Sequence, residues 1–413
     1  MREMKDSGLQ WAGDIPQYWN IAKGKHFMAV LERPVRDDDN VITCFRDGEV
    51  TLRSNRREDG FTVATVEAGY QGIEPGDLVV HGMDGFAGAI GISDSRGKGT
   101  PALNVLSCSE NKKYIMYLLR AMAYTEVFMA LSTGIRVRTC DTNWKKLKSL
   151  DYLIPPADEQ QCIADFLDAK CAEIDALTAD IQTQIDTLEQ YKRSVITETV
   201  TKGLNPNAEM KDSGIQWIGN MPAHWDVVRG KYILHYMQKP VREDDGVITC
   251  FRDGEVTLRS NRREDGFTMS DKEIGYQGID VGDLVVHGMD GFAGSIGISD
   301  SRGKASPVLN VLETDQNKRY IMYYLRSMAY SDVFLALATG IRVRSCDLRW
   351  NKLAELSYPV PPLNEQNAIV KHIDSVLSKA DAVIADKKAQ LATLDEYKKS
   401  LIFEYVTGKK EVI

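Results

Sequence analysis

The chain has 413 residues, enough for two or three domains, and its apolar fraction of 43% and charged fraction of 27% are ordinary for a folded protein, which excludes wholesale disorder. Its net charge of −8 is not typical of a nucleic-acid binder, so any phosphate contacts would depend on local groups of Lys and Arg. No segment is apolar enough for a membrane span or a signal peptide, so we expect neither a membrane association nor secretion.

The chain contains the same sequence twice. Met4 aligns with Met210, the register continues without a gap to the C-terminus, and residues 41–62 recur unchanged at 247–268. Such a duplication predicts two equal modules related by an approximate two-fold axis. A protein that presents one surface twice usually binds something that has two equivalent halves, and duplex DNA with an inverted repeat is the most familiar case.

The cysteines do not follow the duplication as a disulfide framework would. Two pairs are repeated, Cys44 with Cys250 and Cys140 with Cys346, whereas Cys108, Cys162 and Cys171 have no counterpart. The total of seven is odd and includes no Cys-x-x-Cys pair. We therefore expect free thiols in a reducing cytoplasm.

Residues 1–152 form the first module, and its pattern is that of an α+β fold. Short apolar or alternating runs at 41–45, 49–52, 77–80 and 89–92 are separated by Gly-containing turn signals, which predicts strands and hairpins. Apolar residues at helical spacing then predict a helical stretch over about 112–131. Residues 206–358 repeat the module.

Residues 153–205 and 359–413 each predict one long helix. Both begin with a Pro-Pro pair before an acidic first turn, and each carries an apolar stripe at spacings of mostly three and four. The stripes include Ile163, Ile174, Leu177, Ile181, Ile185, Tyr191 and Val195, then Ile369, Ile373, Val376, Val383, Leu391, Leu394, Tyr397 and Leu401. We predict that these two helices pair with each other as an antiparallel coiled coil. The coiled coil would separate the two modules, which are related by the pseudo-two-fold axis. The alternative is that each helix lies on its own module.

No motif for catalysis is present. A DNA aminomethyltransferase would need an (Asn/Asp)-Pro-Pro-aromatic motif, whereas the Pro-Pro pairs here read Ile-Pro-Pro-Ala and Val-Pro-Pro-Leu. The sequence also has no phosphate-binding GxxxxGK[ST] loop and no His/Cys group with zinc spacing. We expect a non-catalytic chain that binds no cofactor of its own.

Three duplicated motifs resemble a known family. Each module opens with Lys-Asp-Ser-Gly-x-Gln-Trp-x-Gly, at Lys5 and Lys211, and ends at Pro-Pro-x-x-Glu-Gln, at 155–160 and 361–366. Each long helix ends near Tyr-Lys-(Arg/Lys)-Ser, at Tyr191 and Tyr397. In this order, and over essentially the whole chain, they resemble the specificity subunits of type I restriction–modification systems.

The resemblance implies that 1–152 and 206–358 are target-recognition domains, each reading half of a bipartite DNA site. It implies that the helices at 153–205 and 359–413 are spacers that dock modification subunits, which bind S-adenosylmethionine and methylate adenine. A separate restriction subunit, a motor-nuclease, can join the complex. Recognition domains of this family commonly differ, whereas those of this chain nearly match, so we expect a palindromic or near-palindromic interrupted target.

Polar residues in the duplicated loops are the candidates for contact with double-stranded DNA, because Arg matches guanine and Asn matches adenine in the major groove. The first group is Arg53, Asn55, Arg56 and Arg57, with Arg259, Asn261, Arg262 and Arg263. The second is His81 and Asp84 with His287 and Asp290, and the third is Arg136 and Arg138 with Arg342 and Arg344.

Each candidate has a structural alternative. The first group could be a solvated loop whose arginines pair with Glu58 and Asp59, and the second could be a hairpin turn with a structural His. Tyr70 and Gln71 are weaker candidates. The duplicated Trp11, Trp19 and Trp144 are interpreted as packing residues. For the whole chain, the alternative to a DNA-recognition subunit is a two-headed scaffold without DNA specificity.

Overall fold

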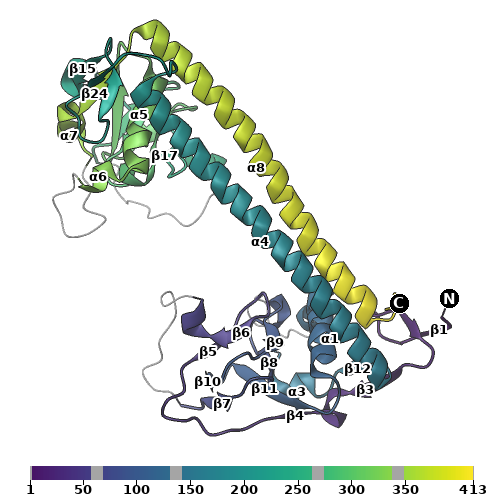
Figure 1. The fold of residues 1–413 in the computed structure, drawn as a ribbon. Helices are drawn as coiled ribbons and strands as arrows, with labels where there is room; N and C mark the ends of the chain where they lie inside the picture. Colours follow the sequence, from purple (N-terminus) through teal and green to yellow (C-terminus); the bar gives the residue numbers. More distant parts are fainter. Residues whose placement is uncertain (1, 57–67, 131–141, 263–273, 337–347, 413) are drawn as a thin grey trace. The chain divides into compact units, whose positions relative to one another are not determined.

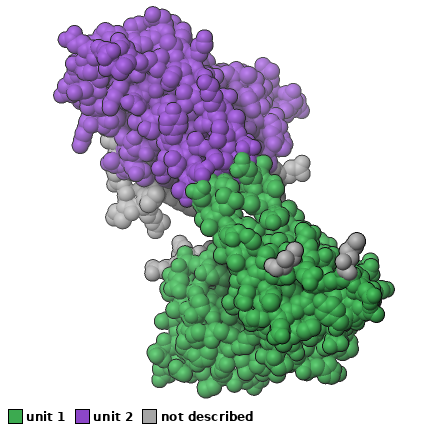
Figure 2. Space-filling model, turned by 45° about the vertical axis from the view of Figure 1, so that its right-hand side comes forward, with its two compact units in different colours: residues 1–181, 388–413 green, residues 182–387 purple. Residues whose placement is uncertain are grey.

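The computed structural model describes residues 2–56, 68–130, 142–262, 274–336 and 348–412 (Figure 1). The chain forms two compact units: unit 1 comprises residues 1–181 and 388–413, and unit 2 comprises residues 182–387 (Figure 2). Each unit therefore combines one module with part of both long helices. The α+β fold class that the sequence predicts is confirmed.

The strands of unit 1 are all joined in antiparallel pairs. A four-stranded sheet has the order β4-β11-β8-β9, and the other strands pair as β1-β2, β3-β12, β5-β6 and β7-β10. The strands are β1 Met4–Asp6, β2 Asp14–Pro16, β3 Asn20–Lys23, β4 Met28–Val30, β5 Ile42–Cys44, β6 Val50–Leu52, β7 Gln71–Ile73, β8 Leu78–His81, β9 Ile90–Ile92, β10 Gly97–Gly99, β11 Leu103–Cys108 and β12 Asp151–Ile154. The four predicted strand runs thus appear as β5, β6, β8 and β9.

Short helices complete the module of unit 1. Helix α1 (Lys112–Tyr124) begins at Asn111, whose side chain accepts hydrogen bonds from the backbone N–H groups of Lys113 and Tyr114. The remaining helices are α2 Val127–Ala130, α3 Trp144–Leu147 and the 3₁₀ turns η1 Gly24–His26, η2 Arg53–Asn55 and η3 Gly85–Ala87. The helical stretch predicted over about 112–131 is confirmed as far as Ala130, but it consists of two helices and not of one. Glu126 has a φ of 60°, in the left-handed region, and this residue separates α1 from α2.

Unit 2 repeats this topology. Its four-stranded sheet has the order β16-β23-β20-β21, and its other pairs are β13-β14, β15-β24, β17-β18 and β19-β22. The elements are β13 Met210–Asp212, β14 Asn220–Pro222, β15 Asp226–Arg229, η5 Gly230–Tyr232, β16 His235–Met237, β17 Ile248–Cys250, β18 Val256–Leu258, η6 Arg259–Asn261, β19 Gln277–Ile279, β20 Leu284–His287, η7 Gly291–Ala293, β21 Ile296–Ile298, β22 Gly303–Ala305, β23 Leu309–Glu313, α5 Lys318–Tyr330, α6 Val333–Ala336, α7 Trp350–Glu355 and β24 Ser357–Val360.

The two long helices are α4 (Ala157–Lys202) and α8 (Leu363–Val406). In unit 1, Lys398 of α8 pairs with Asp175 of α4 at 2.6 Å. In unit 2, Lys192 of α4 pairs with Asp381 of α8, also at 2.6 Å, and Lys387 donates to Gln184. Within unit 2 the residue number rises along one helix as it falls along the other, so the helices run antiparallel, as predicted.

Both interpretations of the apolar stripes hold in part, because each helix also packs on a module. The core of unit 1 contains Ile163 and Leu167 from the start of α4, and Ile402 and Val406 from the end of α8. The core of unit 2 correspondingly contains Ile369 and Ile373 of α8 together with Ile196 and Val200 of α4. Each module is therefore completed by the last turns of the helix that follows the other module.

The Pro-Pro-x-x-Glu-Gln motif fixes the start of each long helix to its module. Buried Gln160 donates to the carbonyl of Pro155 at 3.0 Å and accepts from the backbone N–H of Asn111 at 3.0 Å. Gln366 makes the same contacts with Pro361 and Asn317. These bonds give the buried glutamine amide its hydrogen-bond partners and attach the start of the helix to two segments of the module. This explains why the motif occurs where each module ends.

Four residues of the predicted stripes do not face a core. Leu177 and Tyr397 in unit 1 are 47% and 54% exposed, and Tyr191 and Val383 in unit 2 are 51% and 45% exposed. The sequence spacing placed them in the stripe because it reports periodicity and not the width of the buried face. Within the described residues, no helix is both long and apolar enough to cross a membrane.

Candidate nucleic-acid interface

The candidate site is built on one hairpin of each module, β5-β6 in unit 1 and β17-β18 in unit 2. In unit 1, the turn at Gly48 is held by Arg120 of α1, which donates from Nη2 to the carbonyl of Gly48 at 2.9 Å. Its Nε donates to the carbonyl of Ile90 in β9 at 2.8 Å. Arg326 makes the equivalent bonds in unit 2, at 2.8 Å to Gly254 and 2.7 Å to Ile296. One arginine thus fixes the hairpin turn against the four-stranded sheet of its unit.

An arginine lies over an aromatic ring at the base of this turn. The guanidinium carbon of Arg56 is 4.2 Å from the ring centroid of Phe45, and its Nη1 pairs with Asp47 at 2.6 Å and with Glu49 at 3.2 Å. Arg262 repeats this arrangement over Phe251 at 4.2 Å, with Asp253 at 2.7 Å and Glu255 at 3.1 Å. A ring face below and two carboxylates beside the guanidinium hold its plane in one orientation.

Arg56 forms its described ion pairs with the turn of the hairpin. The structure pairs it with Asp47 and Glu49. The sequence alternative paired this arginine with Glu58 and Asp59, which lie outside the described residues. The contact with Asp47 and Glu49 depends on the β5-β6 register, in which Cys44 lies opposite Val50, and sequence proximity did not reveal it.

The histidine of each module closes a turn through one ring nitrogen. Nδ1 of His81 accepts hydrogen bonds from the backbone N–H groups of Met83, at 3.2 Å, and Asp84, at 3.0 Å. His287 accepts from Met289 and Asp290 in the same way. An accepting Nδ1 carries no proton, and burial lowers the pKa of both rings. The neutral ring therefore has its hydrogen on Nε2, which can only donate.

The carboxylate at the end of this turn also has a partner within the hairpin. Asp84 accepts from Arg46 at 2.8 Å, and Asp290 accepts from Arg252 at 3.1 Å. The predicted structural role of His81 and a role in binding are thus compatible, because Nδ1 builds the turn and leaves Nε2 as a fixed donor.

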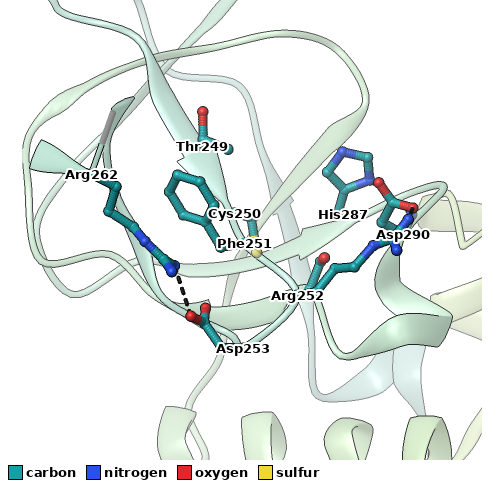
Figure 3. Close-up of a pocket in the computed structure, with 9 residues that line it drawn as sticks. Thr249, Cys250, Phe251, Arg252, Asp253, Arg262, His287 and Asp290 are labelled. Atoms are coloured by element: carbon teal, nitrogen blue, oxygen red, sulfur yellow. Dashed lines mark hydrogen bonds and ion pairs between the residues drawn. The ribbon is translucent and has the colours of Figure 1, made fainter. Parts of the chain in front are cut away.

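In unit 2 these side chains surround a cavity of about 640 Å³ (Figure 3). Arg262 and its partner Asp253 lie at one end, beside the ring of Phe251, and His287, Asp290 and Arg252 gather at the other. The lining is Thr249, Cys250, Phe251, Arg252, Asp253, Arg262, His287, Asp290 and Ser295. Three of the predicted residues, Arg262, His287 and Asp290, therefore belong to one site.

The other predicted residues are not among those that line this cavity. Arg53 donates from Nε to Thr43 at 3.3 Å and Asn55 donates to Thr51 at 2.8 Å, and Arg259 and Asn261 repeat both bonds with Thr249 and Thr257. Their side chains thus bond back to their own hairpin. Tyr70 and Gln71 line a separate cavity of about 730 Å³ with Trp144 in unit 1. The predicted Arg57, Arg136, Arg138, Arg263, Arg342 and Arg344 lie outside the described residues.

The sequence analysis missed the residues that shape the turn itself, namely Phe45, Arg46 and Asp47 with Phe251, Arg252 and Asp253. All six lie in the block that recurs unchanged, so that identity was a signal for them. The packing role predicted for Trp19 is confirmed, since Trp19 and its equivalent Trp225 are fully buried.

The hairpin cysteines do not supply a nucleophile. Burial raises the pKa of Cys44 and of Cys250 to about 12, so both remain thiols. Cys44, Cys108, Cys162, Cys171 and Cys250 are free, as predicted. In the described ranges, no group of His, Cys, Asp and Glu side chains could hold a metal ion.

Comparisons with known proteins agree with the motif resemblance. The chain is 24% identical to the putative type I restriction enzyme MjaX specificity subunit of Methanocaldococcus jannaschii, over 97% of this chain and 95% of that protein. It is 19% identical to the type I restriction enzyme StySPI specificity subunit of Salmonella potsdam, over 96% of this chain and 90% of that protein. No protein-family model matches the chain.

A solved structure has the same fold. A chain from a study of complex assembly and conformational transition of the type I R-M system matches with a TM-score of 0.66 and 13% identity, over 96% of this chain and 99% of that one. Because the identity is low, this likeness concerns the fold. The chain thus has the fold of that chain, and it is similar in sequence, along nearly its whole length, to proteins named as type I restriction enzyme specificity subunits, the family that its motifs resemble.

Proposed function

We propose that this chain is the DNA-recognition subunit of a type I restriction–modification complex, and that each module reads one half of a bipartite target. The observation that carries the proposal is the duplicated Arg-over-Phe and His site, in a chain similar over its length to specificity subunits. The alternative of a two-headed scaffold without DNA specificity is not favoured, because the relatives are named as specificity subunits.

The chemistry of the site suits the edges of bases. Arg56 offers a planar fork that matches the two acceptors of guanine, His81 offers one donor at Nε2, and Asp84 offers acceptors for an amino group. The arginines of the site are balanced by nearby carboxylates. A balanced site attracts phosphates weakly, so the free energy of binding would come from directional hydrogen bonds more than from net charge.

The near identity of the two sites supports a symmetrical target. Eight of the nine residues that line the cavity of unit 2 recur at the equivalent positions of unit 1. Similar sites in two equal modules would read similar half-sites in inverted orientation. We therefore propose a palindromic or near-palindromic target with an interruption between its halves.

Catalysis would come from partners. We propose that modification subunits carrying S-adenosylmethionine methylate adenine at the site that this chain selects, that a motor-nuclease restriction subunit can join, and that the complex works in the cytoplasm. Docking of modification subunits on the long helices is supported by large apolar side chains that are exposed to water. They are Tyr191 and Val383 in unit 2, and Tyr397 and Leu177 in unit 1.

The docking proposal predicts that a negative charge in place of the exposed tyrosines weakens the binding of a modification subunit. Changing Tyr191→Glu together with Tyr397→Glu should weaken binding of a modification subunit by about tenfold or more, because exposed tyrosines are frequent anchors of interfaces. The affinity can be measured by titration calorimetry. Thr187→Glu with Thr393→Glu adds the same charge at exposed, equivalent helix positions and should have little effect. Equal affinities for the two double variants would move the docking surface away from these tyrosines.

The recognition proposal is tested by mapping methylated adenines in the genome of cells that carry this chain and its modification subunit. Cells without the chain are the control. We expect an interrupted inverted repeat that is methylated only when the chain is present. Methylation that does not depend on the chain would contradict the proposal and would favour the alternative of a scaffold without DNA specificity. A salt titration of duplex binding adds a second readout, since phosphate contacts lose affinity log-linearly with salt.

A further inference from the structure

The two units differ at a cavity that is separate from the hairpin sites. In unit 1, Val30 of β4, Gln71 of β7 and Trp144 of α3 line a cavity of about 730 Å³. At the position of Val30, unit 2 has Tyr236 of β16, whose ring stacks on Trp350, the equivalent of Trp144. The two ring centroids are 6.1 Å apart and the ring planes differ by 29°. Unit 2 thus places an aromatic ring beside its tryptophan, where unit 1 has a smaller valine side chain and a cavity.

Trp144 forms a fixed wall of the cavity in unit 1. Its backbone N–H donates to Oδ1 of Asn104 at 3.0 Å, and Nδ2 of Asn104 donates to the carbonyls of Val80 and Thr142, both at 3.1 Å. The side chain of Trp144 is half-buried and packs in part against the core of unit 1. Tyr70, which is also half-buried, adds a second aromatic side chain to the lining. The cavity therefore offers a held aromatic surface that a planar ligand can stack on.

Gln71 adds a hydrogen-bond acceptor to this cavity. Its Nε2 donates to the carbonyl of Leu103 at 3.0 Å, which fixes the amide, and among the residues that the structure describes no donor contacts its Oε1. The equivalent Gln277 donates to the carbonyl of Leu309 at 2.8 Å, but it is only 5% exposed, and its Oε1 is buried without a partner in the described part of the chain. Gln71 is half-buried, so in unit 1 the acceptor stays open to a ligand that carries an N–H group.

We propose that the cavity of unit 1 binds a nucleobase, and that Tyr236 closes the equivalent position of unit 2. The base stacks on Trp144 as the ring of Tyr236 stacks on Trp350, and it donates an N–H to Oε1 of Gln71. The exposed Lys145 on the lining can pair with a phosphate attached to the base. A DNA base out of its stack and a free nucleoside or nucleotide share this chemistry. The site does not depend on the proposed function, since either ligand can occupy it.

The test follows the NMR signals of the tryptophan indole N–H groups in the full chain during a titration with adenosine. Trp144→Phe and Trp350→Phe assign two of the six tryptophans. We expect the Trp144 signal to move and the Trp350 signal to stay, with a dissociation constant of about 1 mM for one stacked, hydrogen-bonded base. The analogue of adenosine with a dimethylated amino group keeps the ring but cannot donate from that group, and it should bind about fivefold more weakly.

The matched variants exchange the residues that distinguish the units. Val30→Tyr gives unit 1 the ring that unit 2 already has, so it should weaken the response of Trp144 to adenosine by about tenfold or more. Tyr236→Val should open the equivalent cavity in unit 2, so that the Trp350 signal now moves. Each side chain already occurs at this position in one unit, and the two opposite exchanges keep the test readable if one variant does not fold.

The source of the base is distinguished with a duplex that contains one unpaired adenine, compared with a fully paired duplex. Movement of the Trp144 signal with free adenosine supports a nucleoside or nucleotide as ligand. Movement with the unpaired adenine alone, in the absence of a response to free adenosine, supports a base of DNA. If adenosine moves no signal and the two duplexes act alike, or if Val30→Tyr responds as the parent chain does, the inference is wrong.

Discussion

Replacing Arg56→Ala together with Arg262→Ala should reduce adenine methylation by the complex by about 100-fold or more, on the basis of roughly 1–3 kcal/mol for each base-reading arginine. Both guanidinium groups lie over a phenylalanine ring at 4.2 Å and pair through Nη1 with carboxylates, so the proposed contact with a guanine would use Nε and Nη2. Their loss also leaves the carboxylates of Asp47 and Asp253 without these counter-charges at the proposed interface. The measurement is the initial rate of methyl transfer from labelled S-adenosylmethionine to a target duplex.

The control for this prediction is Arg36→Ala with Arg242→Ala, which removes the same charge at exposed equivalent positions outside the site. This pair should change the rate by no more than about twofold, as surface changes usually do. Arg56→Lys with Arg262→Lys should fall between the two, because lysine keeps the charge and loses the planar fork. A parental rate in the double alanine variant would show that the arginines serve the hairpin and not the DNA.

The second large effect is expected from Gly91→Ala and Gly297→Ala. A Cβ at Gly91 in β9 would overlap the carbonyl oxygen of Gly48, and one at Gly297 would overlap that of Gly254. These oxygens belong to the hairpin turns that Arg120 and Arg326 hold, so backbone must move and the turn is displaced from its arginine. We expect each variant to lose about 3 kcal/mol in the free energy of unfolding of its unit.

Urea unfolding followed by circular dichroism measures this loss. The matched controls are Gly76→Ala and Gly282→Ala, where φ is 84° and 87° but no atom lies within 4 Å of the added Cβ. They carry backbone strain without a clash and should lose only about 1 kcal/mol. If the β-strand variants lost no more than these controls, the close approach of β9 to the hairpin turn would not be a tight one.

The sequence predicted the fold in its outline, because the duplication, the strand runs and the Pro-Pro starts of the helices are local signals. It did not predict the break at Glu126, since a positive φ at a non-glycine residue has no marker in a pattern of apolar spacing. It also placed Tyr191 and Tyr397 in a buried stripe, although both lie in water. Periodicity identifies a helix and does not distinguish a face that packs from one that adjoins it.

The candidate site was harder to predict, because its geometry depends on contacts between distant residues. Arg56 and His81 were candidates by residue type alone. What orients Arg56 is Phe45 with Asp47 and Glu49, and what fixes the turn is Arg120, which is 72 positions from the carbonyl that it binds. The use of Nδ1 by His81 follows from the backbone of one turn. The sequence contains each of these residues but not their distances.

The packing of α8 onto unit 1 has a consequence for the order in which the protein folds during translation. Unit 2 is continuous in sequence, whereas unit 1 needs residues 388–413, among them the fully buried Ile402 and Val406. Tyr114 of the first module also donates its hydroxyl to the carbonyl of Val406, at 3.2 Å. The module that leaves the ribosome first is therefore the last to acquire its complete core, and it waits with an uncovered apolar surface while the second module is made.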